Sequence, residues 1–191
     1  VFSMVALGNG SAAAFVLGQS DWTSNTPAVT QAGMTTPTYL DYDDMSDQLF
    51  VSDTGANRIL VFDFGGGADL SNGRAADKVL GQSGFEANGT GSGLGQLSGP
   101  KGVDYDEDNN RIFVSDYGNS RLLSYSTGSI TDGMSGTLEG QEDFLGDNLL
   151  YGPMDRLYIA EDYRVVVIGV NGGASVDAIG VVDDTGYPMV H

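Results

Sequence analysis

Two pairs of an aspartate and an arginine have the residue types and spacing of a site for polar chemistry. Asp53 is followed by Arg58, and Asp116 by Arg121, with a short glycine-containing turn inside each pair. A functional site is usually made once, whereas these pairs recur, so we interpret them as structural ion pairs. Each carboxylate is expected to accept N–H groups of its turn as well. The turn residues that suit a positive φ are Gly55, Asn57, Gly118 and Asn119.

A second candidate for chemistry is the acidic stretch DYDEDNN at residues 104–110. It contains three aspartates in the pattern D-x-D-x-D: Asp104, Asp106 and Asp108. Calcium takes about six to eight oxygen ligands, and its binding loops usually end in a bidentate glutamate. Ser115 stands at that position here, and the matching earlier triplet, Asp41, Asp43 and Met45, lacks its third carboxylate. We expect a solvated acidic turn and no cofactor, with calcium as the alternative.

The composition excludes several kinds of site. The chain has no cysteine, and its single histidine is the last residue, His191. Disulfides, thiolate chemistry, zinc sites and histidine-based catalysis therefore lack their usual groups. The formal net charge of −18 repels nucleic acids and anionic membranes. We predict no catalytic, cofactor-binding or metal-binding residues and no nucleic-acid partner.

The glycine content and the short hydrophobic runs predict an all-β protein. Twenty-nine of the 191 residues are glycine, and stretches that favour a helix are few. No apolar run approaches the roughly 20 residues of a membrane-spanning helix, so we expect no membrane span. The sequence starts at Val1 without a signal segment, and we expect a processed product or an excerpt of a longer chain.

An internal repeat organises the chain. The segment FVSDTGANRILVF at 50–62 returns as FVSDYGNSRLLSY at 113–125, a shift of 63 positions. The same shift superimposes Leu17-Gly18-Gln19 on Leu80-Gly81-Gln82, and Pro37 on Pro100. A repeat of this length indicates a solenoid, a propeller or an array.

Each repeat is expected to fold into four short antiparallel strands, which form one blade of a propeller. We assign blades to residues 37–82 and 100–141, and a degenerate blade to 145–182 with its inner strand at 147–151. Alternatively, Pro153 is the counterpart of Pro100 and that inner strand is lost. Residues 1–19 would end a preceding blade, and residues 183–191 would begin a further blade or form a tail. The predicted fold is a β-propeller segment of about three blades, an incomplete ring on its own.

The repeated segment resembles the NHL-repeat family. VLGQ at 79–82, a proline shortly before a strand that ends in Asp, and RIFVSDYGNSRLLSY at 111–125 are similar to the signature of that family. The resemblance implies a β-propeller that most often serves as an interaction platform. It also implies an alternative, because related propellers hydrolyse lactones or cleave small substrates at a metal or carboxylate on the central axis. Asp41 and Asp104 on the inner strands would line such an axis.

The order of strands places the loops on two faces. The long connections 20–36 and 83–99 share one face, and the acidic turns 43–47 and 106–110 lie on the other. Loops longer than about 12 to 15 residues are candidates for binding or for covering a neighbour. The apolar side chains that we expect to plug the blade junctions are Trp22, Phe85 and Leu94.

Three blades leave two apolar faces to be covered. The chain is therefore expected to be an excerpt of a full propeller, one half of a closed homodimer, or a subunit of a head-to-tail polymer. We predict a non-catalytic extracellular or cell-surface module that acts through protein or glycan contacts and self-assembly. A lactonase-like or lyase-like propeller enzyme is the alternative. Glycosylation acceptor patterns at Asn9 and Asn88 bear on the location.

Overall fold

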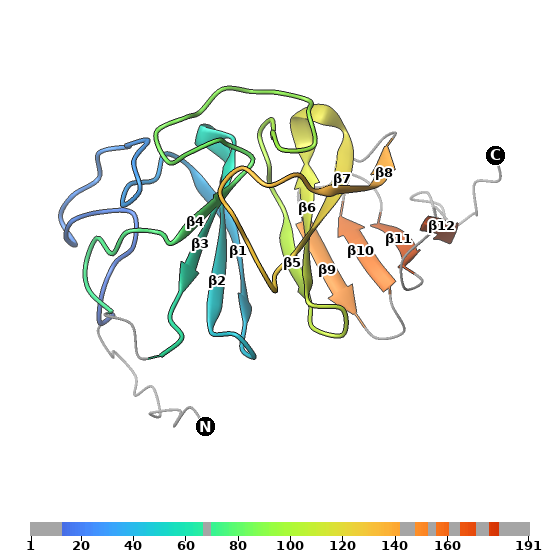
Figure 1. The fold of residues 1–191 in the computed structure, drawn as a ribbon, viewed down its shortest axis with the longest axis horizontal. Helices are drawn as coiled ribbons and strands as arrows, with labels where there is room; N and C mark the ends of the chain where they lie inside the picture. Colours follow the sequence, from blue (N-terminus) through green and yellow to red (C-terminus); the bar gives the residue numbers. More distant parts are fainter. Residues whose placement is uncertain are drawn as a thin grey trace.

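The computed structural model describes residues 13–66, 70–141, 148–152, 156–160, 165–170 and 176–179. This part of the chain forms three four-stranded antiparallel sheets that stand side by side in an arc (Figure 1). The first sheet consists of β1 (Pro37–Asp43), β2 (Gln48–Asp53), β3 (Arg58–Asp63) and β4 (Lys78–Leu80). The second consists of β5 (Val103–Asp106), β6 (Arg111–Asp116), β7 (Arg121–Ser126) and β8 (Thr137–Gln141). The third consists of β9 (Asn148–Gly152), β10 (Arg156–Ala160), β11 (Val165–Val170) and β12 (Val176–Ile179).

Each sheet keeps its strands in chain order, which is the arrangement of a propeller blade. The first strands of the three blades meet at the inside of the arc, where β5 lies between β1 and β9 (Figure 1). The predicted all-β propeller fold is therefore confirmed. The predictions for residues 1–12 and 183–191 lie outside the described residues. In the described part, no helix is long and apolar enough to cross a membrane.

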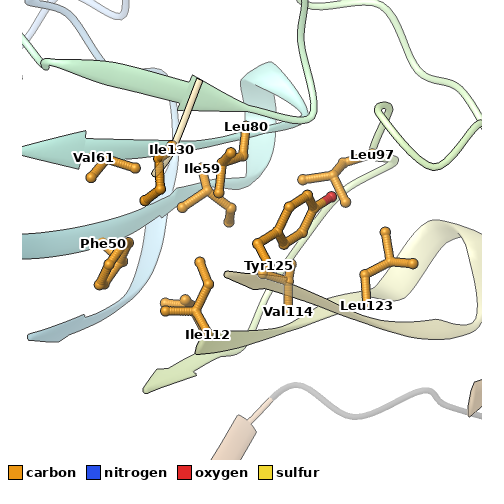
Figure 2. Close-up of a cluster of buried hydrophobic side chains, with 11 residues drawn as sticks. Phe50, Ile59, Val61, Leu80, Leu97, Ile112, Val114, Leu123, Tyr125 and Ile130 are labelled. Atoms are coloured by element: carbon orange, nitrogen blue, oxygen red, sulfur yellow. The ribbon is translucent and has the colours of Figure 1, made fainter. Parts of the chain in front are cut away.

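The core lies between neighbouring blades. Side chains alternate along a strand, so each blade has one face toward the preceding blade and one toward the following blade. Phe50 and Val61 of the first blade pack against Ile112 and Tyr125 of the second (Figure 2). A separate cluster joins the second and third blades and contains Phe113, Leu122, Leu149, Leu157 and Ile159.

Residues 1–19 were expected to end a preceding blade, but no strand pairing includes residues 15–19. The sheet β1–β4 is complete without this segment, and no other described strand lies beside it. Val16 instead binds the loop after β3: its carbonyl accepts the N–H of Gly73 at 2.9 Å. Val79 of the next repeat accepts the N–H of Gly133 in the same way, at 3.0 Å. Val16 therefore lies against the first blade as Val79 lies against the second, although residues 15–19 form no strand.

The plugs of the blade junctions are not the residues that the sequence suggested. Trp22 is 53% exposed and Leu94 is 43% exposed, while Phe85 is partly buried beside the first blade. The buried plugs are Met34 and Leu97, which are themselves 63 positions apart. The prediction from the larger side chains was wrong, because the size of a loop residue does not determine whether it is buried. The shift of 63 positions, in contrast, relates the two buried residues.

The glycine of the repeated LGQ sequence packs directly against this plug. Gly18 and Gly81 have φ angles of +79° and +81°. A Cβ atom on Gly18 would lie 2.9 Å from the Met34 side chain, and one on Gly81 would lie 2.4 Å from Leu97 Cδ1. Glycine is required at both positions by the left-handed backbone and by the close approach.

Replacing Gly81 with Ala is expected to destabilise the protein by roughly 2–5 kcal/mol. The change adds the strain of a positive φ to overpacking against Leu97. Urea denaturation followed by circular dichroism measures the effect. Gly84→Ala is the control, since no atom lies within 4 Å of its Cβ position, and it should change stability by less than about 1 kcal/mol. Equal stability of the two variants would contradict the role of Gly81.

Candidate functional site

A cavity of about 770 Å³ opens between the inner ends of the three blades, on the face of the acidic turns. Its walls come from β1, β5 and β9 and from the turns that follow β1 and β5. The lining residues are Asp41, Tyr42, Asp44, Asp104, Tyr105, Glu107, Asp108, Tyr151 and Gly152. Carboxylates and tyrosines therefore dominate the walls, and none of these lining side chains is basic.

Asp41 and Asp104 each reach from one blade to the next. Oδ2 of Asp41 accepts the backbone N–H of Tyr105 at 2.6 Å, and Oδ2 of Asp104 accepts the backbone N–H of Tyr151. The inner strand of a blade is a sheet edge whose N–H groups have no strand partner on that side. The two carboxyl groups satisfy these donors. The alternative enzyme prediction placed both residues on the axis, and the structure brings them together there.

The side chains of Asp41 and Asp104 are hydrogen-bonded to each other. Burial, the negative charge of Asp41 and this hydrogen bond raise the pKa of Asp104 to about 8 from its ordinary 3.8. Both burial and a nearby like charge favour the neutral form of a carboxyl group. Asp104 is therefore mostly protonated at neutral pH. A protonated carboxyl group beside a second carboxyl group can supply a proton donor and a proton acceptor, as general acid–base catalysis requires.

The tyrosines of the cavity are held by the blades. The ring of Tyr105 stacks on Phe50 with centroids 6.4 Å apart, and that of Tyr151 stacks on Phe113 at 6.1 Å. A hydrogen bond to Asp47 raises the pKa of Tyr42 to about 12, and burial with the charge of Asp43 does the same for Tyr105. Both hydroxyl groups therefore stay protonated at neutral pH. These tyrosines were not predicted as site residues, although Tyr42 and Tyr105 are 63 positions apart and so share one position of the repeat.

The third blade departs from the pattern at Leu150. Leu150 is paired with Tyr158 in the same way that Asp41 is paired with Phe50, so it stands at the position of the missing third carboxylate. Its side chain is 61% exposed. Among the described blades, this inner-strand position therefore carries a carboxyl group in the first two, at Asp41 and Asp104.

The three carboxylates of the D-x-D-x-D turn do not lie together. Asp106 is buried and accepts hydrogen bonds from Arg111 Nε at 2.8 Å and from the N–H of Asn109. Asp104 is turned toward Tyr151, and Asp108 lines the cavity. Within the described residues, no three carboxylate or histidine side chains come together as a metal site. Whether the protein carries a cofactor, calcium included, stays a prediction.

The two aspartate and arginine pairs are buried parts of the fold. Arg58 and Asp53 form an ion pair at 2.9 Å with both side chains fully buried, and Arg121 Nε lies 2.7 Å from Asp116. Each arginine also donates to carbonyl groups of the long loops; Arg121 binds those of Ser92, Gly93 and Gln96. The pairs therefore fasten the loops to the blades.

The expected contacts of these aspartates with the turn were wrong in detail. The backbone N–H groups that they accept belong to the preceding long loops, at Thr35 and Thr36 for Asp53 and at Ser98 for Asp116. Positive φ angles occur at Asn57 and at Ser120, and not at Gly118 or its counterpart Gly55. Those glycines are needed for space instead, because a Cβ on Gly118 would lie 2.5 Å from the side chain of Ser98.

A comparison with protein-family models assigns part of the second blade. Residues 97–125 match the NHL repeat. The resemblance proposed from the sequence is confirmed there, and the NHL repeat covers the plug Leu97, Asp104 of the carboxyl pair and the Asp116–Arg121 ion pair. No curated protein sequence matches the chain at a significant level.

The chain is similar to several solved structures. A proposed 6-phosphogluconolactonase from Bacteroides uniformis aligns with a TM-score of 0.55 and 15% identity over 80% of this chain and 44% of its own. A nidogen structure in complex with laminin gives 0.49 and 15%, over 74% of this chain and 46% of its own. The periplasmic gluconolactonase of Pseudomonas aeruginosa gives 0.49 and 16%, over 77% and 39%. The chain thus spans less than half the length of these proteins.

These findings correct the expectation of a non-catalytic interaction module. The chain shares its propeller fold with a proposed lactonase, and its blades meet around a cavity that holds a hydrogen-bonded carboxyl pair. Recurrence in the repeat was used above as a sign of a structural role, and Asp41 and Asp104 also recur at that spacing. Recurrence was misleading because adjacent inner strands bring two repeated carboxyl groups into one site.

Proposed function

We propose that the chain belongs to a β-propeller hydrolase in which Asp41 and Asp104 cleave an ester or lactone by general acid–base catalysis. The observation that carries the proposal is the hydrogen-bonded carboxyl pair within a cavity of about 770 Å³. Small-molecule sites are usually such concave pockets with a few convergent polar groups, and a strongly perturbed acid within one is a functional candidate. The shared fold agrees with this reaction class, but the residues carry the proposal.

In the proposed reaction, Asp41 accepts a proton from water while the water oxygen forms a bond to the carbonyl carbon. The bond between that carbon and the leaving oxygen then breaks. The leaving oxygen keeps the bonding electron pair and takes the proton of Asp104. A lactone gives one hydroxy acid. The proton on Asp41 then passes to Asp104 through their hydrogen bond, which restores the starting state.

The charge of the cavity favours a neutral substrate. Asp44, Glu107 and Asp108 are exposed at its rim, and no basic side chain is among the lining residues. A cleft lined by charges of one sign repels ligands of that sign. A phosphate monoester carries about −1.5 to −2 charges at neutral pH. We therefore propose that a neutral lactone is preferred to a phosphorylated one.

The hydrolysis rate is expected to fall about tenfold per pH unit above pH 8. Asp104 must be protonated to serve as the acid, and its pKa is raised to about 8, so alkaline solution removes the active form. The measurement is pH-stat titration of glucono-δ-lactone hydrolysis, with the spontaneous rate subtracted at each pH. Glu86→Gln, a change of an exposed carboxylate on the long-loop face, should leave the profile unchanged. No hydrolysis above the spontaneous rate at any pH would contradict the proposed function.

We also propose that the protein acts outside the cytoplasm, at or beyond the cell surface. Two observations support this location: the strongly acidic composition, and the exposure of Asn88 within its glycosylation acceptor pattern in the loop after β4.

A further inference from the structure

Two buried oxygen atoms at one end of the first blade have no hydrogen-bond donor. Asp43, the last residue of β1, is fully buried; its Oδ1 accepts the N–H groups of Met45 and Ser46, while its Oδ2 accepts none. Gln48, the first residue of β2, is paired with Asp43, and its Oε1 is also buried without a donor. Opposite residues of an antiparallel pair share one face of the sheet, with Cβ atoms about 4.5–5.5 Å apart. Two unsatisfied acceptors therefore lie on neighbouring side chains, which a folded protein usually avoids.

The hydroxyl group of Tyr105 does not supply the missing donor. It approaches Asp43 from the second blade, and burial together with the charge of Asp43 raises the pKa of Tyr105 to about 12. Its hydrogen bond to Asn110 Oδ1, at 3.3 Å, leaves Oδ2 of Asp43 without a donor. The hydroxyl oxygen therefore adds a further oxygen atom beside the carboxyl group.

A second carboxyl group stands on the other side of Gln48. Asp63 of β3 is paired with Gln48, and its Oδ2 lies 3.5 Å from Gln48 Nε2, a long distance for a hydrogen bond. Turning the amide over would bring its NH2 group toward Asp43 and its oxygen toward Asp63, so one unpaired acceptor would replace another. Arg74 is engaged elsewhere, with the carbonyl group of Asp63 and the carboxylate of Asp77. The amide of Gln48 therefore leaves an oxygen beside a carboxyl group in either orientation.

The other two blades have an arginine at the position of Gln48. In the second blade Arg111 is paired with Asp106, the counterpart of Asp43, and its Nε lies 2.8 Å from Asp106 Oδ2. In the third blade Arg156 begins β10 at the same place in the strand register. The first blade thus combines two carboxyl groups with a neutral amide where its neighbours carry a guanidinium group.

We infer that the first blade binds a calcium ion through Asp43 Oδ2, Gln48 Oε1 and Asp63 Oδ2, at the place that the guanidinium group of Arg111 takes in the second blade. Calcium accepts carboxylate and amide oxygens in a flexible arrangement, and water completes its shell of about six to eight ligands. Magnesium demands a near-ideal octahedron, and softer metals prefer nitrogen or sulfur ligands. None of these three residues lines the cavity, so the inference does not depend on the proposed hydrolysis.

Calorimetric titration of the EDTA-treated protein with calcium chloride, in about 0.15 M sodium chloride, tests the inference. The wild type should bind one ion per chain with a dissociation constant of about 0.1 mM or below. Calcium at about 100 times that constant should raise the melting temperature by roughly 5–10 °C. Magnesium should bind at least about tenfold more weakly, because the ligands are not fixed in an octahedron.

Two variants locate the ion. Gln48→Arg introduces the guanidinium group of the second blade, so it should lower the calcium affinity at least about tenfold and raise the melting temperature of the calcium-free protein. Asp43→Asn should also lower the affinity at least about tenfold, although its amide oxygen can still accept the N–H groups of Met45 and Ser46. Asp108→Asn, a change of an exposed aspartate in the other acidic turn, is the matched control and should bind calcium as the wild type does.

Three results would overturn the inference. The first is a wild-type protein that binds no calcium, or that binds magnesium equally well. The second is an unchanged calcium affinity in Gln48→Arg. The third is an affinity that is lost in Asp108→Asn and kept in Asp43→Asn, since the ion would then be held by the carboxylates of the cavity. Circular dichroism of the calcium-free variants confirms that each is folded before the titration.

Discussion

Replacing Asp104 with Asn is expected to lower the rate of lactone hydrolysis about 100- to 10,000-fold, the usual contribution of a general acid or base. The amide oxygen of Asn can still accept the N–H of Tyr151, and its NH2 group can still donate to Asp41, so the blade contact is kept. What the variant lacks is a proton to give to the leaving oxygen. The expected loss is therefore in kcat, measured by pH-stat at pH 7.

The same variant is expected to be more stable than the wild type in neutral and alkaline solution. The pKa of Asp104 is about 8 in the folded protein and 3.8 without its surroundings. The folded state therefore binds this proton more tightly, and its contribution to stability is complete below pH 3.8 and disappears as the pH rises to 8. Asn is neutral at every pH, so the variant does not lose this contribution to stability as the pH rises. The difference in melting temperature between variant and wild type should grow from pH 4 to pH 8, then stay constant above about 8.

The hydrolysis rate and the melting temperature together distinguish a catalytic role of Asp104 from a structural one. A merely structural carboxyl group would give the stability change without loss of turnover. Glu86→Gln, the matched change from carboxylate to amide away from the cavity, should alter neither the rate nor the pH dependence of melting. A variant with full activity and an unchanged pH profile would show that Asp104 is not the acid, and the proposed mechanism would then be wrong.

The blades could be predicted because each repeat carries local signals at a fixed spacing. Short consecutive runs of hydrophobic residues mark β2, β3, β6 and β7, and the shift of 63 positions aligns the ion pairs without knowledge of the fold. The third blade was harder to predict from the sequence. Its inner strand β9 lies at Asn148–Gly152, one residue from the position expected, with Leu150 where the repeat has aspartate. The loss of the Asp removes the sequence signal together with the contact that it makes.

The site could not be predicted from the repeat alone. Neither Asp41 nor Asp104 is unusual in its own hairpin, and the perturbed pKa arises only when β1 and β5 lie side by side. Contacts between repeats depend on the rotation from blade to blade, which the period of the sequence does not give. The buried residues of the long loops were also not predicted from the sequence. Met34 is buried in the first loop and Leu97 in the second, while the larger Trp22 is exposed.

Replacing Arg121 with Met is expected to destabilise the fold by about 3–5 kcal/mol, the cost of leaving a buried charge without its partner. Asp116 is fully buried, and its carboxylate would lose the Nε donor at 2.7 Å. Three carbonyl groups of the loop 83–99 would lose their donors as well. At about 2–4 °C per kcal/mol for a chain of this size, the melting temperature should fall by roughly 6–20 °C.

A surface pair provides the control for this variant. Arg74 and Asp77 also form an ion pair at 2.8 Å, but Asp77 is 40% exposed, so Arg74→Met should cost less than about 1 kcal/mol. Hydrogen exchange adds a local readout, because loss of Arg121 should release amides of the loop 83–99 before those of β6. If Arg121→Met and Arg74→Met cost the same, the ion pair does not fasten the loop. The repeated Asp and Arg would then need a role outside stability, since burial without an energetic contribution would leave their recurrence in two blades unexplained.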